Sequence, residues 1–235
     1  MKEPVSAVYN ECNRFGLSLF PDQYFFLSID DPPYFSGPEK RKFYGYRVSP
    51  IGVKRVDYPA NGHWQVPGPE YFDELKRISA HQIIWGCNYF KYDFSPGRIV
   101  WDKCNGKSSF SDCEIAYCSF HDSVRLFRFM WSGMLQGKSI EEGWIQQGNK
   151  KLNEKRIHPT QKPVALYDWL FSKYPIPVGA YVVDPHVGSG SSRIAAYKAG
   201  VNFIGFEIDN TAFMKQEERF KKFIEQYYER YQTKI

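Results

Sequence analysis

Four consecutive residues, Asp31-Pro32-Pro33-Tyr34, place a carboxylate, two prolines and a phenol ring directly after an apolar run. The run, residues 24–29, is typical of a buried strand. The two prolines remove two N–H donors and fix two backbone angles, so the strand cannot continue through them. The loop therefore presents an acceptor oxygen, carbonyl groups and a flat ring at the carboxyl end of a strand, where open α/β sheets bind ligands. An ordinary strand exit is the alternative, and other parts of the sequence must decide.

A second group of chemically capable residues lies near the C-terminus, around Gly188-Ser189-Gly190. These glycines follow a predicted strand and open a predicted helix, where they let a ligand approach backbone N–H groups. Glu207 ends the next predicted strand and can accept hydrogen bonds from two ribose hydroxyls, while Asp184 can hold a cationic group. Arg193 in place of a third glycine counts against a dinucleotide, and the Walker Gly-Lys-Ser/Thr is absent. Two carboxylates without a phosphate-binding lysine suit a positively charged nucleoside such as S-adenosyl-L-methionine.

The elements that must position these groups follow from hydrophobic patterning. Beyond the run before Asp31, we expect strands at 7–10, 82–87, 98–102, 114–120, 180–183 and 203–207, and helices at 14–20, 69–80, 161–174, 192–198 and 211–231. The short spacing between the strands at 98–102 and 114–120 predicts antiparallel pairing. At 235 residues, the chain forms one large domain or two small ones.

The composition limits the classes of function. With 235 residues, a net charge of +5 and 19 Phe, 17 Tyr and 6 Trp, the chain can bury a large core and still stack rings on the bases of a polyanionic partner. The five cysteines form no Cys-x-x-Cys pair and match no zinc spacing, so we expect reduced thiols and no metal. No apolar run could span a membrane and no signal peptide is evident. We therefore expect a cytoplasmic protein without a membrane partner.

Together these segments resemble the motifs of amino-group DNA methyltransferases of the beta, circularly permuted class. The catalytic loop of that family matches residues 31–34, its cofactor loop matches 184–191, and its ribose-binding strand matches 205–209. Residues 156–163, Arg-Ile-His-Pro-Thr-Gln-Lys-Pro, match the segment that precedes the cofactor motif. The catalytic loop comes first and the cofactor loop last, which is the beta-class order. The resemblance covers roughly residues 7–220 and implies a single α/β catalytic domain over residues 1–235 that depends on S-adenosylmethionine. The implied fold is Rossmann-like and circularly permuted, with a mixed, largely parallel sheet flanked by helices.

The resemblance implies site-specific methylation of the N6 amino group of adenine in double-stranded DNA, as in restriction-modification systems. The implied catalytic residues are Asp31, Pro32, Pro33 and Tyr34. The Asp31 side chain and the Pro32 carbonyl would hold the amino group, and Tyr34 would stack on a base flipped out of the duplex. Asp rather than Ser at position 31 favours adenine N6 over cytosine N4. No Pro-Cys pair is present for a covalent cytosine-C5 reaction.

The family also implies a cofactor site built from several segments. Its members here would be Asn10, Glu11, Asp31, His158, Thr160, Gln161, Lys162, Asp184, Pro185, His186, Gly188, Ser189, Gly190, Ser191, Glu207, Ile208 and Asp209. Either Asn10 or Glu11 would contact the adenine ring of the cofactor. The family usually has phenylalanine at the position of His186, so we expect cofactor affinity to depend on pH. A capped helix start, with Thr160 as N-cap and Pro163 in the first turn, is compatible with this role.

Two irregular segments are candidates for contact with DNA. Residues 36–68 combine proline, glycine and basic side chains and predict a mobile loop after the catalytic motif. Residues 121–156 mix aromatic, basic and glutamine side chains and take the place of a small target-recognition region. Solvated surface segments are the alternative in both cases. The basic residues expected to contact DNA are Lys40, Arg41, Lys42, Arg125, Arg128, Lys138, Lys150 and Lys151.

Other functions stay open at this level. Cytosine N4 or a protein glutamine amide could be the acceptor, although the glutamine enzymes place the cofactor loop before an Asn-Pro-Pro-Tyr loop. A binding module that kept the fold and lost catalysis is motivated by His186 and by the loose N-terminal match. A nicotinamide dehydrogenase is disfavoured by Arg193. Beta-class relatives are often dimers, so the resemblance allows a homodimer without any interface being evident in the sequence, and it implies a bacterial or phage origin.

Overall fold

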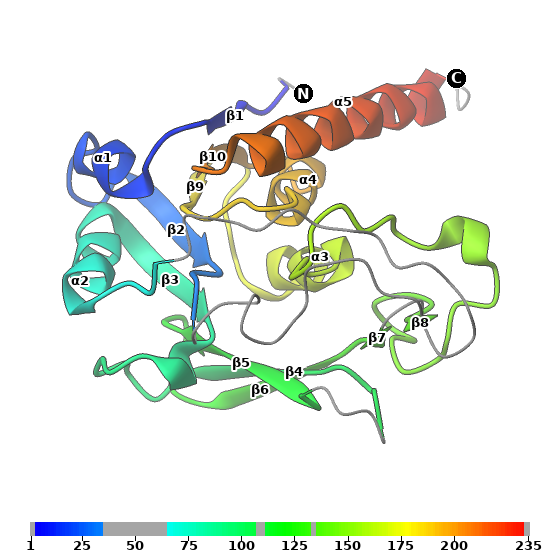
Figure 1. The fold of residues 1–235 in the computed structure, drawn as a ribbon, viewed down its shortest axis with the longest axis horizontal. Helices are drawn as coiled ribbons and strands as arrows, with labels where there is room; N and C mark the ends of the chain where they lie inside the picture. Colours follow the sequence, from blue (N-terminus) through cyan, green and yellow to red (C-terminus); the bar gives the residue numbers. More distant parts are fainter. Residues whose placement is uncertain (1–2, 35–64, 107–110, 133–134, 233–235) are drawn as a thin grey trace.

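The computed structural model describes residues 3–34, 65–106, 111–132 and 135–232, and the side chains up to 229. Of the segment predicted as a mobile loop, 36–68, residues 36–64 lie outside the described residues. These include Lys40, Arg41 and Lys42. The described parts form a central sheet between two layers of helices (Figure 1).

An eight-stranded sheet forms the centre of the described structure (Figure 1). Its strands are β1 (Ser6–Tyr9), β2 (Phe25–Asp30), β3 (Ser79–Trp85), β4 (Arg98–Asp102), β5 (Cys113–Cys118), β6 (Val124–Arg128), β9 (Tyr181–Asp184) and β10 (Asn202–Phe206). They lie in the order β1-β10-β9-β2-β3-β5-β4-β6, and within this sheet only β5 runs antiparallel to its neighbours. The antiparallel pairing predicted between the strands near 98–102 and 114–120 is therefore confirmed.

Five α-helices are found in the described part of the chain: α1 (Asn13–Ser18), α2 (Pro69–Ile78), α3 (Val164–Lys173), α4 (Ser191–Lys198) and α5 (Asn210–Gln232). Helices α1 and α2 pack on one face of the sheet, where Leu75 belongs to the same buried cluster as Ile84. Helices α3 and α4 pack on the other face, where Leu170 belongs to the same cluster as Ile83. Consecutive residues of β3 thus point to opposite faces, as strand geometry requires. None of these described helices is long and apolar enough to cross a membrane.

The predicted recognition region, residues 121–156, is only partly separate from the sheet. Strand β6 belongs to it and pairs in parallel with β4, with Phe127 opposite Trp101. After β6 come a hairpin of β7 (Trp131–Ser132) and β8 (Leu135–Gln136) and a short 3-10 helix at Lys150–Leu152; a second 3-10 helix, Cys87–Tyr89, follows β3. Of the residues in β6 only Phe127 is buried, so the sequence there carries no clear strand pattern.

The two strands that carry the candidate motifs, β2 and β9, are adjacent and parallel, with Leu27 opposite Val182. From β2 the chain reaches β3 through α2 on one side, and from β9 it reaches β10 through α4 on the other. The connections diverge between these two strands, which is the switch point where open α/β sheets form a crevice. The loops after Asp30 and Asp184 therefore leave the same edge of the sheet.

Two element boundaries differ from the predictions for physical reasons. Helix α3 begins at Val164 and Pro163 is its N-cap residue, so the prediction of Thr160 as N-cap is wrong. The N–H of Val164 donates at 2.8 Å to Glu154 Oε2, a carboxylate from outside the helix. Strand β3 begins at Ser79, three residues before the predicted start at 82, and no loop separates it from helix α2. The N–H of Ser79 donates to the Leu75 carbonyl of α2, and Ser79 also pairs with Phe25 of β2.

Gly205 in β10 lies where the sheet closely approaches the loop after β9. A Cβ atom there would lie 2.3 Å from Val187 Cγ2 and 2.9 Å from the ring of Phe203. Gly205→Ala should therefore lower the free energy of unfolding by about 1–3 kcal/mol, the usual cost of overpacking. Urea denaturation followed by tryptophan fluorescence measures this loss.

Gly148→Ala is the matched control for this variant. No described atom lies within 4 Å of a Cβ built at position 148. Its effect should stay within about 0.5 kcal/mol, as for ordinary surface substitutions. Equal unfolding midpoints for the two variants would contradict the close approach of β10 to the loop.

Candidate active site

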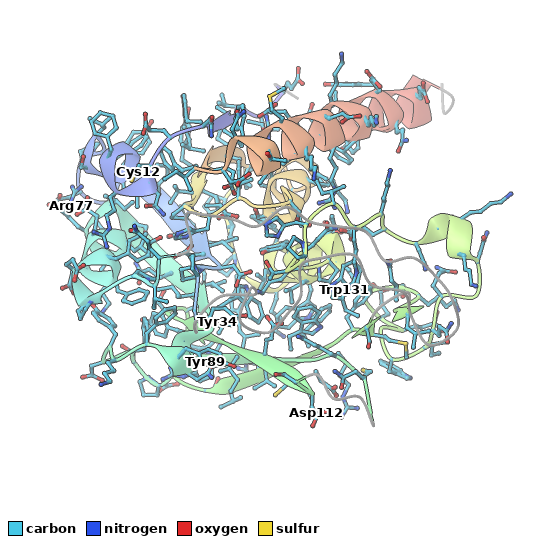
Figure 2. All side chains as sticks on the ribbon, viewed as in Figure 1. Cys12, Tyr34, Arg77, Tyr89, Asp112 and Trp131 are labelled. Atoms are coloured by element: carbon cyan, nitrogen blue, oxygen red, sulfur yellow. The ribbon has the colours of Figure 1, made fainter. Side chains whose placement is uncertain are left out.

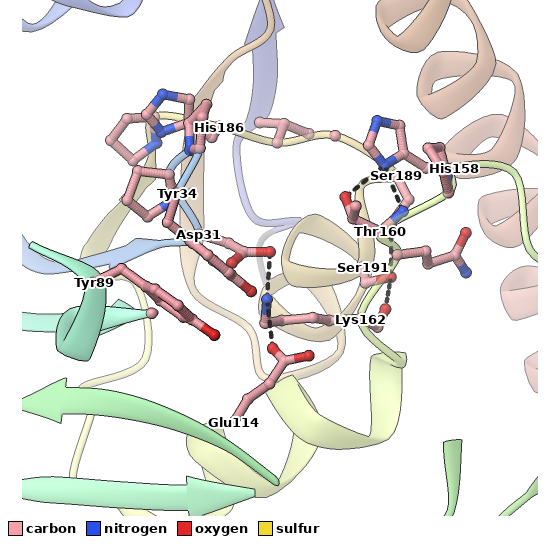
Figure 3. A pocket seen from close by; sticks show the side chains of 18 of the residues that line it. Asp31, Tyr34, Tyr89, Glu114, His158, Thr160, Lys162, His186, Ser189 and Ser191 are labelled. Atoms are coloured by element: carbon pink, nitrogen blue, oxygen red, sulfur yellow. Dashed lines mark hydrogen bonds and ion pairs between the residues drawn. The ribbon is translucent and has the colours of Figure 1, made fainter. Parts of the chain in front are cut away.

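A cavity of about 850 Å³ opens at the carboxyl ends of β2, β9 and β10 (Figure 3). Its size is in the range of small-molecule and cofactor sites. Most of the predicted site residues line it: Glu11, Asp31, Pro32, Pro33, Tyr34, His158, Thr160, Gln161, Lys162, Pro185, His186, Gly188, Ser189, Ser191, Glu207 and Ile208. The predicted cofactor residues that are not part of the lining are Asn10, Asp184, Gly190 and Asp209. The fold therefore brings segments from both ends of the chain to one crevice.

The two oxygens of the Asp31 carboxylate lie in different environments (Figure 3). Oδ2 lies 2.5 Å from the Lys162 ammonium. Oδ1 is shielded from solvent and has no hydrogen-bond partner among the described residues. Burial raises the pKa of Asp31, and the attraction of the Lys162 charge opposes that rise. Because buried polar atoms normally have partners, this oxygen has unused acceptor capacity in a residue that lines the cavity.

Lys162 lies at the centre of a buried ion cluster. Its side chain is only 4% exposed, and its ammonium lies 3.0 Å from Glu114 Oε2 as well as contacting Asp31. Burial works to lower the pKa of Lys162, but the two carboxylates outweigh burial and raise the pKa well above its usual value. Lys162 therefore stays protonated beside Asp31 over the whole working pH range of a protein.

Glu114 and Lys103 extend this cluster and were not predicted from the sequence. Glu114 comes from β5, and its Oε1 pairs with the ammonium of Lys103, which follows β4. Burial works to raise the pKa of Glu114, but Lys162 and Lys103 lower it to about 2. The sequence did contain a signal, because Glu114 alternates in phase with Ala116 and Cys118, both fully buried. A carboxylate at a core-facing strand position indicates a charged partner.

The ring of Tyr34 is backed by the ring of Tyr89 (Figure 2). The two rings are stacked, with centroids 4.7 Å apart and an interplanar angle of 7°. Tyr34 also passes close to Gly86, where a Cβ would lie 2.5 Å from Tyr34 Cδ1 and where φ is +68°. Both the close approach and the left-handed backbone require glycine at position 86. The Tyr34 ring therefore has a fixed place at the cavity wall.

The Glu207 carboxylate is held by backbone groups at the end of β10. Its Oε2 accepts from the Gly188 N–H and its Oε1 from the Asp209 N–H, each at 2.8 Å. Asn10 Nδ2 donates to the Glu207 carbonyl at 2.7 Å. Burial raises the pKa of Glu207. Carboxylate oxygens have further lone pairs, so Glu207 can still accept hydrogen bonds from hydroxyl groups in the cavity.

Asp184 is not part of the cavity lining, and its carboxylate stabilises the loop after β9. Its carboxylate accepts hydrogen bonds from the Ser192 hydroxyl and from the His186 N–H, the latter at 2.9 Å. Burial raises the pKa of Asp184 to about 7. Gly190, with φ +74°, is the N-cap residue of α4 and ends this loop. The predicted contact of Asp184 with a cationic group stays a prediction, and its structural role is to shape the loop.

His186 takes part in a partly buried network with Asp30, Tyr71 and Asn13. Its Nδ1 lies 2.7 Å from Asp30 Oδ1, and Asn13 Nδ2 lies 2.8 Å from its Nε2. The Tyr71 hydroxyl donates to Asp30 Oδ2 at 2.8 Å. Burial works to lower the pKa of His186, but the charge and hydrogen bond of Asp30 outweigh burial and the pKa is raised. A phenylalanine at this position could make none of these hydrogen bonds.

The segment before α3 is organised by the Glu154 carboxylate. Its Oε1 accepts from Gln161 Nε2 at 2.7 Å and from Arg219 of α5 at 2.6 Å. The Gln161 carbonyl in turn accepts from Trp131 Nε1 at 2.8 Å. These contacts join β7, the segment before α3 and helix α5, and they hold Arg156 and residues 158–162 at the cavity wall.

His158 and Thr160 form a pair within this segment (Figure 3). His158 Nδ1 lies 3.1 Å from the Thr160 hydroxyl. Burial lowers the pKa of His158 to about 4, so its ring is neutral at pH 7. The pair therefore offers the cavity hydrogen-bonding groups without a charge.

The basic residues predicted to contact DNA lie outside the cavity lining where the structure describes them. Arg125, Arg128, Lys138, Lys150 and Lys151 are all exposed. Arg128 lies 3.3 Å from Asp102, and Lys138 lies 2.6 Å from Glu142. Ion pairs at such exposed positions are weak, so another anion can replace the carboxylate as the partner of the basic side chain.

Two solved structures share the fold of this chain. The M1.HpyAVI-SAM complex superposes with a TM-score of 0.52 at 17% identity, over 91% of this chain and 98% of that one. TTHA0409 from Thermus thermophilus, provisionally described as a DNA modification methylase and complexed with S-adenosyl-L-methionine, gives a TM-score of 0.52 at 15% identity, over 93% and 94%. The predicted fold class is confirmed: an α/β methyltransferase fold with a largely parallel sheet flanked by helices.

Sequence relatives show the family. The N6_N4_Mtase family, described as DNA methylase, matches residues 130–218. YubD of Escherichia coli (strain K12), provisionally named a methylase, is 41% identical over 207 residues, which cover 86% of this chain and 83% of YubD. The type II methyltransferase M2.LlaDCHI of Lactococcus lactis subsp. cremoris is 28% identical over 138 residues, covering 58% of this chain and 45% of that protein. The chain belongs to the N6/N4 family of DNA methylases.

His186→Phe tests the partly buried network through its pH dependence. Because the pKa of His186 is raised in the folded protein, its pairing with Asp30 stabilises the fold below the unfolded-state pKa. This contribution is lost as the pH rises through the folded-state pKa. The difference in unfolding free energy between the wild type and His186→Phe should therefore shrink as the pH rises above the ordinary histidine pKa of about 6.5, as measured by urea titrations.

His81→Phe is the matched control, because it replaces a histidine whose pKa shifts the other way. Burial lowers the pKa of His81, so the wild type gains stability relative to His81→Phe as the pH rises. The stacking of this ring on Phe120, with centroids 4.0 Å apart, is kept by phenylalanine. The same direction of change for both variants would rule out the pairing assigned to His186.

Proposed function

We propose that the protein transfers a methyl group from S-adenosyl-L-methionine to the N6 amino group of adenine in DNA. The observation that carries the proposal is Asp31 Oδ1, a shielded carboxylate oxygen without a hydrogen-bond partner among the described residues. The residue Asp31 lines the same cavity as Glu207. Membership of the N6/N4 family supports an amino nitrogen of a base as the acceptor. By resemblance to the family, aspartate rather than serine at position 31 favours adenine over cytosine.

The residues around the cavity fit S-adenosyl-L-methionine. Glu207 would accept hydrogen bonds from its ribose hydroxyls, and Phe206 and Ile208 offer apolar surface beside them. The neutral His158 and Thr160 would meet the methionine end. When bound, the cofactor supplies an electrophilic methyl group on a sulfonium. The two solved structures of the same fold that hold this molecule support the assignment.

The catalytic loop would supply two acceptors for the N–H bonds of the target amino group. That nitrogen is a poor nucleophile, because its lone pair is delocalised into the ring of the base. Hydrogen bonds to Asp31 Oδ1 and to the Pro32 carbonyl would favour a pyramidal nitrogen and fix its orientation. Tyr34, backed by Tyr89, would give an aromatic wall to a base taken out of the duplex.

Asp31 is also placed to receive the proton that the nitrogen loses as it gains a methyl group. Burial raises the pKa of Asp31, which makes the carboxylate a stronger base than an exposed aspartate. The charge of Lys162 opposes this effect and favours the ionised form before the transfer. The mechanism needs no covalent intermediate with the protein.

Asp31→Ala should abolish methyl transfer and leave cofactor binding intact. The change removes one acceptor of the amino group, and a loss of at least about 10²–10³-fold in rate is expected for a preorganised catalytic group. Radiolabelled methyl transfer to DNA measures the rate, and calorimetry measures the affinity for S-adenosyl-L-methionine. Mass spectrometry of the digested nucleosides identifies the product.

Asp93→Ala, a change at an exposed aspartate, is the control and should keep full activity. Full activity of Asp31→Ala would contradict the mechanism. N4-methylcytosine without N6-methyladenine would replace adenine by cytosine as the target. Cofactor binding without any transfer by the wild type would indicate a binding module instead.

Lys150 and Lys151 should contribute to DNA affinity through phosphate contacts. Replacing both with alanine is expected to weaken binding and to lower the slope of log K against log salt by about 1–2, since each neutralised phosphate contributes about 0.9. Fluorescence anisotropy with a labelled duplex at several salt concentrations measures the slope. The matched control replaces Lys221 and Lys222, an adjacent exposed pair on α5. An equal loss of DNA affinity in both double variants would indicate only a general effect of charge. That result would contradict a role for residues 121–156 in DNA recognition.

A further inference from the structure

Four alternating charges form a row that ends at the catalytic loop, and Figure 3 shows three of them, Glu114, Lys162 and Asp31. Lys103, just after β4, pairs with Glu114 of β5, and Glu114 Oε2 lies 3.0 Å from the Lys162 ammonium. Lys162 in turn lies 2.5 Å from Asp31 Oδ2. The row therefore crosses from the antiparallel side of the sheet to its switch point and contains two cations and two anions.

Fold stability alone does not account for this row. A buried ion pair must overcome the loss of hydration of both charges, and well-packed apolar residues of similar volume often stabilise a core equally well or better. The row also stops at a residue whose other oxygen, Asp31 Oδ1, is left without a partner among the described residues. Charged groups arranged in this way are common at functional sites.

The geometry of Lys162 explains why a second carboxylate is useful. Its backbone carbonyl accepts from the Ser191 hydroxyl at 2.8 Å, which fixes the base of the side chain but not its long, flexible stem. With Asp31 as its only partner, the ammonium could move across to bond both carboxylate oxygens. Glu114 draws it from the opposite side and keeps it on Oδ2, and Lys103 holds the other oxygen of Glu114.

We propose that Glu114 is a positioning residue for the methyl transfer. Acting through Lys162, it holds the Asp31 carboxylate in the orientation in which Oδ1 faces the target amino group, and Lys103 fixes Glu114 in turn. This inference rests on the proposed function, because it assigns to Glu114 the task of preparing the acceptor of that reaction. Glu114 does not itself need to touch the base or the cofactor.

Glu114→Gln tests the proposal because it removes the charge and keeps the shape. We expect kcat to fall about 10–100-fold, the cost of a misplaced catalytic group, while the affinity for S-adenosyl-L-methionine is unchanged. Glu114→Asp, which restores the charge, should recover part of the loss. An unchanged kcat would overturn the proposal. A raised KM for DNA at unchanged kcat would also overturn it, because that result indicates direct contact with DNA.

A readout that needs no activity is the titration of Asp31 in the ligand-free protein, followed by NMR of 13C-labelled aspartate. Glu114 raises the pKa of Asp31 and Lys162 lowers it. Glu114→Gln should therefore move the titration of Asp31 to lower pH, and Lys162→Met should move it to higher pH. A structural role without coupling would leave the midpoint of Asp31 in place in Glu114→Gln and would overturn the proposal.

The two readouts separate the inference from the proposed function. If the wild type methylates no DNA but the Asp31 titration shifts in both expected directions, the proposed function fails while the coupling along the row stands. If Glu114→Gln does not fold, Lys103→Gln takes its place, because Lys103 lies at the outer end of the row. We expect Lys103→Gln to lower kcat and to shift the titration midpoint of Asp31. If this variant keeps both the kcat and the Asp31 midpoint of the wild type, the proposal is overturned.

Discussion

The parallel pairing of β2 with β9 is the constraint on which the rest of this structure depends. These strands are far apart in the sequence, and their register places the loop after Asp30 beside the loop after Asp184. The network between Asp30 and His186 spans this junction of the two strands. Because the side chains of a strand alternate between faces, a shift of one residue in β2 would turn Asp31 away from Lys162. The chemistry of the cavity is thus set by the hydrogen bonds of a sheet.

Much of the fold could be predicted because its signals are local. The runs that became β2, β9 and β10 are apolar over nearly their whole length and are bounded by proline, glycine or acidic residues. The apolar stripe of α2 appeared at helical spacing and is buried as expected. The loops after β2 and β9 could be singled out for the same reason, since each is a short run of residues at the end of a strand. Their meeting in one cavity followed from the rule that parallel strands share an edge.

Contacts between distant segments could not be predicted in this way. Glu114 meets Lys162 because β5 returns beside β3, and no residue near Glu114 in the sequence identifies that neighbour. Thr160 satisfied a local rule for an N-cap, but helix α3 begins only at Val164. The Val164 N–H donates to Glu154, whose segment folds back onto the start of the helix. Strand β6 escaped the pattern because only Phe127 among its residues is buried. Contact with DNA by the exposed arginines and lysines stays a prediction.

Asp30 and Asp31 are consecutive, and their carboxylates turn to opposite sides of the sheet. Asp30 meets Tyr71 of α2, whereas Asp31 meets Lys162, whose carbonyl is bonded to Ser191 of α4. The side chains of two consecutive residues thus connect this edge of the sheet to both helical layers. The consequence is that the two layers share one polar anchor, at the edge where the cavity opens.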